Sequence, residues 1–218
     1  MLGLEVRQNL LIPMNRWLKR GLDLVIAGLL GVLALPVLAI AAIWICVTSG
    51  SAALYFQERD GEAGRKIRVW KLRTMYADAD AMLERHLDSS PEARREWARY
   101  FKLKQDPRIL PGIGHLLRRT SLDELPQLWN VLKGEMSLVG PRPFPDYHLE
   151  SFAPEFRALR SKVPPGLTGM WQVSARSNGD TRVQEALDTY YIRNWSPWLD
   201  LHILAQTVGA VFFPNGAY

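Results

Sequence analysis

The sequence is poor in the residues that build disulfides and zinc sites. Cys46 is the one cysteine among 218 residues, so no disulfide can form within the chain, which is typical of the cytoplasm. The histidines are scattered rather than grouped, and this spacing argues against a zinc site; they are His86, His115, His148 and His202.

Common nucleotide-binding and hydrolase motifs are also absent. The chain has no G-x-G-x-x-G, no G-x-S-x-G and no H-E-x-x-H pattern. The glycines in the stretch Gly61 to Lys66 stand too close together for the G-x-x-x-x-G-K-[ST] pattern of a phosphate-binding loop. Internal repeats and low-complexity tracts are missing as well, so any chemistry must come from less common arrangements.

What the sequence does have is one long uncharged segment, Leu24 to Gln57, with an apolar core from Leu24 to Val47. A membrane-spanning helix needs about 20 apolar residues, and a signal peptide only about 7–15. We therefore expect this segment to enter a lipid bilayer. Basic residues flank it on both sides, namely Arg7, Arg16, Lys19 and Arg20 before it and Arg59, Arg65, Lys66, Arg68, Lys71 and Arg73 after it.

Basic flanks favour the cytoplasmic side, and here both flanks are basic. A helix that enters the membrane, bends and returns would place both on that side. Pro36 offers a place to bend, because it cannot donate a hydrogen bond to the carbonyl of Val32. The alternative is a single spanning helix that tolerates its proline.

Length and charge define the rest of the molecule. Residues 1–52 are expected to form an N-terminal lead and a re-entrant membrane helix hairpin, and residues 53–218 one cytoplasmic, membrane-associated domain. The net charge of +5 favours phosphate or anionic lipid, and the membrane segment makes phosphorylated substrates better candidates than nucleic acid.

The pattern of elements predicts an α+β fold that is mostly helical with a minor sheet. Two short strands surround a turn at Asp60 to Gly64, and five segments read as helices, the last with an apolar stripe that predicts a core face. The expected strands are 52–57 and 67–73, and the expected helices are 77–87, 92–103, 122–132, 181–194 and 199–213.

Asp123 and Glu124 stand out because they are adjacent acids that follow Arg118 and Arg119. One reading is structural: Ser121 caps a helix and Glu124 completes a capping box, or Asp123 is itself the cap. The other is chemical: the cations and a divalent metal offset two repelling carboxylates, and one acid attacks phosphorus while the other holds the metal.

Two further basic groups could bind phosphate. Lys71 and Arg73 would share one face of a strand. Arg142 stands between Pro141 and Pro143, which stiffen the backbone around a side chain suited to phosphate. For each of these cations, an ordinary solvated charge is the alternative.

The ordered set of motifs resembles the bacterial sugar transferases, also called monotopic phosphoglycosyl transferases, in the short form that is the catalytic module alone. The resemblance covers residues 16–218. It rests on the apolar segment with its proline and on Tyr55 to Arg59, Lys71 to Met75, Thr120 to Gln127, Gly140 to Pro143, Pro165 to Ser174 and Asn194 to Asp200. One departure is Ala175, where relatives that make exopolysaccharides usually have glycine.

This resemblance implies transfer of a sugar 1-phosphate, with a hexose expected, from a UDP-sugar to polyprenyl (undecaprenyl) phosphate, with release of UMP, Mg²⁺ as cofactor and a covalent phosphoglycosyl-aspartate. It implies that Asp123 is the nucleophile, Glu124 its metal-associated partner, and that Lys71, Arg118 and Arg142 bind phosphate. The enzyme would work on the cytoplasmic face of the bacterial inner membrane at the start of exopolysaccharide or glycoconjugate synthesis; formation of a homo-oligomer is left open.

Two other functions fit parts of the sequence. A direct, metal-dependent inverting glycosyltransferase would use Asp78 and Asp80 as metal ligands and release UDP, although an exposed acidic helix face explains the same pair. A non-enzymatic module anchored to anionic lipid would tolerate loss of the Asp123 charge.

Overall fold

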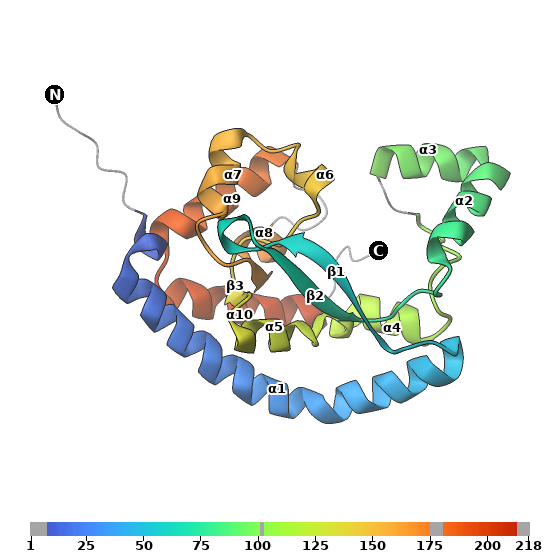
Figure 1. The fold of residues 1–218 in the computed structure, drawn as a ribbon, viewed down its shortest axis with the longest axis horizontal. Coiled ribbons are helices and arrows are strands. Elements are labelled where there is room, and N and C mark those ends of the chain that lie inside the picture. Colours follow the sequence, from blue (N-terminus) through green and yellow to red (C-terminus); the bar gives the residue numbers. More distant parts are fainter. Residues whose placement is uncertain (1–7, 101–102, 175–180, 213–218) are drawn as a thin grey trace.

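A computed structural model describes residues 8–100, 103–174 and 181–212. Arg7, Ala175 and Phe213 lie outside these ranges. Figure 1 shows the order of the elements. The α-helices are α1 (Pro13–Ser49), α2 (Ala79–Ser89), α3 (Pro91–Tyr100), α4 (Ile113–Thr120), α5 (Gln127–Lys133), α6 (Asp146–Leu149), α7 (Pro154–Arg160), α8 (Met170–Ser174), α9 (Thr181–Asn194) and α10 (Pro197–Phe212). The short 3₁₀ turns and the strands are η1 (Asn9–Leu11), η2 (Glu62–Gly64), η3 (Leu122–Glu124), β1 (Leu54–Asp60), β2 (Lys66–Leu72), β3 (Ser137–Val139) and β4 (Gly166–Thr168).

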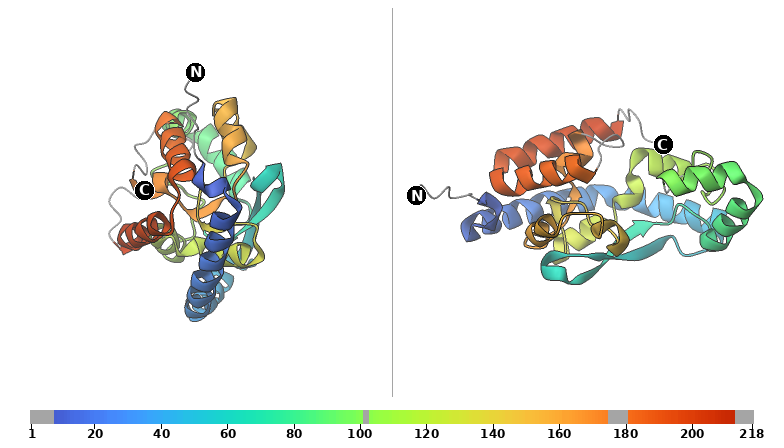
Figure 2. Two further views of the ribbon diagram at one scale, coloured as in Figure 1. Left: turned by 90° about the vertical axis from the view of Figure 1, so that its left-hand side faces the viewer. Right: turned by 90° about the horizontal axis from the view of Figure 1, so that it is seen from above.

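Helix α1 is the longest element and runs along one side of the molecule, as Figures 1 and 2 show. It continues through Pro36 as one curved helix, so this segment does not divide into two antiparallel legs. Among the described residues it is the helix long and apolar enough to cross a membrane. Whether it enters a bilayer and returns stays a prediction.

One face of α1 is buried against the rest of the chain. This face carries alanine at every seventh residue, Ala27, Ala34 and Ala41, and then Ile45. Small side chains let the helix backbone approach its neighbours closely. The outer face keeps large apolar side chains exposed from Trp17 to Val47, and an apolar surface of this extent indicates contact with lipid or protein.

Both ends of α1 pack against later parts of the chain. At its start, η1 buries Leu10 in a core cluster with Tyr191 and Trp195. Towards its end, Ile45 packs in a second cluster with Leu72 and Leu110. The apolar segment is therefore packed into the fold along its length instead of standing away from it.

Within the described ranges, the strands form two small sheets of two strands each, β1 with β2 and β3 with β4. Strands β1 and β2 form an antiparallel hairpin in which Leu54 pairs with Leu72 and Asp60 with Lys66. Strands β3 and β4 are parallel, with Ser137 opposite Gly166. Gly140 must be glycine, because a Cβ there would lie 2.9 Å from the backbone nitrogen of Gly166.

The mostly helical α+β class is confirmed. The hairpin and helices α2, α3, α9 and α10 lie close to their predicted ranges. The single helix predicted for 122–132 is wrong: the chain forms η3, then turns, and α5 begins after Pro126. Ser121 has a left-handed backbone with φ of 55° and makes no side-chain capping bond, so the predicted Ser121 cap is wrong. The predicted Asp123 cap is also wrong, because Asp123 lies inside η3 and Pro126 precedes α5.

The predicted core face of the last helix is also partly wrong. Leu201 and Val208 are 42% and 57% exposed, whereas Ile203 is 1% exposed. This helix also contacts the β3–β4 pair, since the Thr207 hydroxyl lies 2.8 Å from that of Thr168.

Candidate active site

The two predicted acids lie in the short turn η3, directly after α4. Helix α4 ends at Thr120, and the left-handed Ser121 reverses the chain so that η3 starts at once. The backbone N–H of Glu124 donates to the carbonyl of Ser121, which holds this turn tight. Asp123 and Glu124 are thus fixed between two helices on a turn that contacts β2.

Glu124 is the centre of a charged cluster. Lys71, at the end of β2, places Nζ 2.8 Å from Glu124 Oε1. Arg142, in the loop after β3, places Nη2 2.8 Å from the same oxygen. The Glu124 side chain is only 17% exposed. Three separate segments of the chain therefore meet at one carboxylate. The two cations expected to bind phosphate lie next to the acid expected to hold a metal.

The cations decide the charge of Glu124. Burial alone would raise the pKa of this carboxyl, but the charges and hydrogen bonds of Arg142 and Lys71 outweigh it and lower the pKa to about 2. Glu124 in turn raises the pKa of Arg142. Glu124 is therefore ionised throughout the physiological range and cannot serve as a proton donor there.

Asp123 has the opposite character. Burial and repulsion from Glu124 raise the pKa of Asp123 to about 6, while the charges of Lys71 and Arg118 oppose this rise. At neutral pH it is mostly an ionised carboxylate. Paired acids with pKa values pushed in opposite directions are typical of sites where the two groups have different tasks.

The remaining predicted cations differ in their placement. Arg118 lies close enough for its charge to lower the pKa of Asp123. Arg73 donates from Nε to the carbonyl of Ala52, 2.7 Å away, and its guanidinium lies 5.7 Å from the ring centroid of Tyr55. The structure does not bring Arg73 to the acid pair, and its role in phosphate binding stays a prediction.

Two residues that the sequence did not reveal hold this cluster in place. Asn130, fully buried in α5, accepts from the N–H of Trp70 at 3.2 Å and donates to the carbonyl of Arg68 at 2.7 Å, which fixes β2 beside α5. Arg160 donates to the carbonyl of Arg142. Both partners are distant in sequence, so no local pattern could have pointed to either residue.

The surroundings of Arg160 are largely aromatic, because its guanidinium lies among rings of the loop and helices that follow Arg142. Its Cζ is 5.0 Å from the ring centroid of Phe144 and 5.5 Å from that of Phe152. Such cation–π contacts help to hold a buried guanidinium in place. The carbonyl of Arg142 therefore meets a donor whose position is itself fixed.

Other candidate metal ligands lie apart. Asp78 and Asp80 are exposed at the start of α2, and Asp78 pairs with Arg85 at 3.3 Å. Over residues 8–100, 103–174 and 181–212, no group of three or more His, Cys, Asp or Glu side chains could hold a metal ion. The Asp123–Glu124 pair supplies two carboxylates, a number that suits Mg²⁺ when substrate phosphates and water complete its shell.

Comparison with known proteins places this site in a family. The model of the family described as "Bacterial sugar transferase" matches residues 14–214. The chain belongs to the bacterial sugar transferase family. The match includes the apolar helix, the η3 acids and the loop that carries Arg142.

Relatives in the sugar transferase family are similar over nearly the whole chain. A UDP-galactose-lipid carrier transferase of Erwinia amylovora is 46% identical over 99% of this chain and 44% of its own length. An undecaprenyl-phosphate galactose phosphotransferase of Salmonella typhimurium is 41% identical over 99% of this chain and 44% of its own length. The chain thus spans less than half of these relatives. The exopolysaccharide production protein ExoY of Sinorhizobium fredii is 39% identical over 94% of this chain and 90% of its own length.

Proposed function

We propose that this chain transfers a hexose 1-phosphate from a UDP-sugar to polyprenyl (undecaprenyl) phosphate and releases UMP, as an initiating step of exopolysaccharide synthesis. The observation that carries the proposal is a Glu124 side chain, only 17% exposed, that is held by Lys71 and Arg142 beside Asp123. The names of similar proteins, which specify galactose or glucose and undecaprenyl phosphate, support the substrate class.

In the first proposed step, the Asp123 carboxylate attacks the phosphorus bonded to the sugar. A P–O bond forms to Asp123, the P–O bond to the phosphate of UMP breaks, and UMP leaves with the bonding electrons. In the second step, an oxygen of the lipid phosphate attacks the same phosphorus. The bond to Asp123 breaks, and its carboxylate is restored.

The charges around Asp123 suit this chemistry. An anionic nucleophile must approach an anionic diphosphate, which requires nearby cations. Arg142 has a planar guanidinium suited to two phosphate oxygens, and Lys71 offers a compact charge. Arg118 contributes further positive potential near Asp123. When a diphosphate enters, these cations can exchange part of their contact with Glu124 for contact with phosphate.

Magnesium fits the residues present. Burial first, and then repulsion from Glu124, raise the pKa of Asp123, and the neighbouring cations do not fully offset this rise. Asp123 and Glu124 would hold Mg²⁺ with oxygens of the donor diphosphate. Bound there, the ion would supply charge neutralisation for the phosphates. Glu124, already ionised, would keep its charge for this task.

The apolar outer face of α1 supports a site at the membrane surface, and the basic residues on both flanks of the apolar segment favour the cytoplasmic face of the inner membrane. The exposed side chains from Trp17 to Val47 would contact acyl chains. The lipid phosphate and the water-soluble donor could then reach the same acids from opposite directions.

The test is to incubate the purified chain with UDP-sugar and Mg²⁺ but without lipid acceptor. The wild type should release about one UMP per active site and gain the mass of a sugar phosphate on the peptide that contains Asp123. Asp123→Asn should abolish both signals, and Glu124→Gln should slow the reaction and weaken its dependence on Mg²⁺. Normal turnover with acceptor, but no adduct and no burst, would show direct transfer instead.

A panel of UDP-sugars with polyprenyl phosphate would identify the donor by UMP release. Asp78→Asn is the matched control, because it removes an exposed carboxylate outside the cluster. It should leave UMP release unchanged. Release of UDP, together with loss of activity in Asp78→Asn, would support the inverting glycosyltransferase instead.

A further inference from the structure

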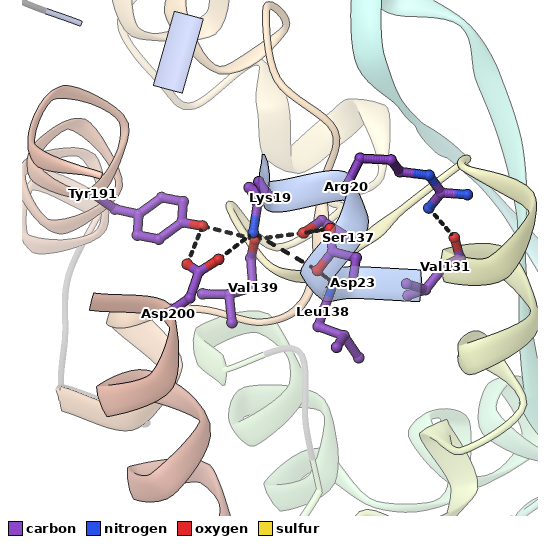
Figure 3. Close-up of polar contacts among 9 residues, drawn as sticks. All are labelled: Lys19, Arg20, Asp23, Val131, Ser137, Leu138, Val139, Tyr191 and Asp200. Carbon is purple, nitrogen blue, oxygen red and sulfur yellow. Dashed lines mark hydrogen bonds and ion pairs between the residues drawn. The ribbon is translucent and has the colours of Figure 1, made fainter. Parts of the chain in front are cut away.

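A buried polar cluster joins α1 to the strand that leads to Arg142. Lys19 Nζ lies 2.6 Å from Asp200 Oδ2 and 3.9 Å from Asp23 Oδ1, as Figure 3 shows. The three side chains are only 4–7% exposed. The Tyr191 hydroxyl lies 2.7 Å from Asp200 Oδ1 and 2.9 Å from the carbonyl of Val139, and these two acceptors share its proton.

Asp23 binds β3 directly. Its Oδ2 accepts from the Ser137 hydroxyl at 2.7 Å, and its Oδ1 accepts from the backbone N–H of Leu138 at 3.1 Å. The chain then continues through Gly140 and Pro141 to Arg142. Asp23 therefore fixes the strand from which the Arg142 loop departs.

Arg20, on the same turn of α1, binds the other side of the site. Its Nη1 donates to the carbonyl of Val131 at 2.5 Å, and its Nη2 donates to that of Leu132 at 2.8 Å. These carbonyls end α5, which begins directly after the η3 turn and Pro126. One turn of the apolar helix is thus bonded to β3, which leads to Arg142, and to α5, which follows the turn that carries Glu124.

Stability alone gives little reason for this arrangement. A buried cluster of one cation and two carboxylates is often no more stabilising than apolar side chains of similar volume. Further along α1, contact with the domain is made by small apolar residues such as Ala27 and Ala34. Those residues leave rotation of the helix about its axis weakly specified, whereas directional hydrogen bonds fix it.

We propose that Lys19, Arg20 and Asp23 are positioning residues for the lipid half of the reaction. They set the Arg142–Glu124 pair relative to the helix that contacts the membrane, where a lipid phosphate must arrive. The water-soluble donor does not depend on that alignment, and Arg142 keeps its bonds to Glu124 and Arg160 within the domain. This inference rests on the proposed function.

The experiment uses the full chain in lipid nanodiscs and measures the two half-reactions separately. Asp23→Asn and Lys19→Met should keep the rate of acceptor-independent UMP release within about threefold of the wild type. Turnover with polyprenyl phosphate should fall at least about tenfold, with a raised KM for the lipid but not for UDP-sugar. Asp88→Asn, an exposed carboxylate on α2, is the matched control and should change neither.

Tyr191→Phe is a second variant that keeps the ring in the core and removes only the hydroxyl. It should show the same split between the half-reactions, and thermal unfolding should show that each variant is folded. If Asp23→Asn does not fold, Tyr191→Phe decides the question.

Equal losses in both half-reactions, or no loss in either, would overturn the inference. If the wild type turns over without an acceptor-independent burst, the covalent step is wrong, and the KM values of the variants for the two substrates decide. A raised KM for the lipid alone supports the inference. An equal change in KM for the lipid and for UDP-sugar contradicts it. A wild type that releases no UMP with both substrates overturns the proposed function and this inference together.

Discussion

Arg142 and Glu124 form an ion pair of 2.8 Å in which Oε1 of the acid also faces Lys71. Two cations on one oxygen keep Glu124 ionised and fix its direction. This relationship separates the roles of the adjacent acids: Glu124 supplies a permanent charge, and Asp123, with a pKa of about 6, is the group whose charge changes near neutral pH.

The first prediction concerns the shape of the Arg142 side chain. Arg142→Lys keeps the charge but loses the planar fork that can bind two oxygens at once. We expect kcat/KM to fall at least ~10-fold, about 1.4 kcal/mol, with membrane association unchanged in a flotation assay. Near-normal kinetics would show that this residue acts only as a charge.

The second prediction concerns pH. The nucleophile must be an ionised carboxylate, and the pKa of Asp123 in the free protein is about 6. The rate of the donor half-reaction, as kcat/KM for UDP-sugar, should therefore be constant above this pH and fall about tenfold per pH unit below it. A profile that stays flat down to about pH 5, a full unit below that pKa, would contradict the assignment.

The third prediction uses Glu124→Gln to move that profile. Removing the negative neighbour favours the Asp123 carboxylate, because repulsion from Glu124 contributes to its raised pKa. The acidic limb should shift to lower pH even though the maximum rate decreases. A limb that stays in place would mean that a different group controls the pH dependence.

The fourth prediction concerns Asn130. Asn130→Ala leaves the N–H of Trp70 and the carbonyl of Arg68 without their partner inside the fold. We expect a loss of roughly 2 kcal/mol or more, seen as a fall in Tm of roughly 4–8 °C for a chain of this size. Asn194→Ala, whose amide bonds only to its own helix, is the control and should have little effect.

The fifth prediction concerns topology. Because both ends of α1 pack on one domain, they should lie on the same side of the membrane. Single cysteines at Gln8 and Ser151 in a Cys46→Ser background should both resist an impermeant maleimide in intact spheroplasts and both react after permeabilisation. Reaction of only one of them in intact spheroplasts would indicate a spanning helix.

Local patterns predicted the elements that depend on neighbouring residues. The hairpin follows from alternating strands around a turn, and α9 has the predicted bounds, Thr181–Asn194. The grouping of Lys71, Glu124 and Arg142 was reached through the ordered motifs and a resemblance, and no spacing along the chain could place these residues within ion-pair distance.

The missed features have physical reasons. The left-handed Ser121 separates α4 from η3, and the chain breaks again between η3 and α5 at Pro126, which has no N–H to continue the helix. The supports from Asn130, Arg160 and Lys19 act through partners that are distant along the chain. Composition alone suggests that the basic residues beside the apolar segment are exposed charges, whereas Lys19 is buried together with Asp23.

The alanine face of α1 has a practical consequence for handling the protein. Ala27, Ala34 and Ala41 complete core clusters whose other members lie far along the chain. A fragment cut after Gly50 would lose those contacts and expose the residues beneath them. Truncation aimed at a water-soluble enzyme should therefore yield aggregated material, and detergent or lipid particles that retain the helix are the suitable form for biochemical work.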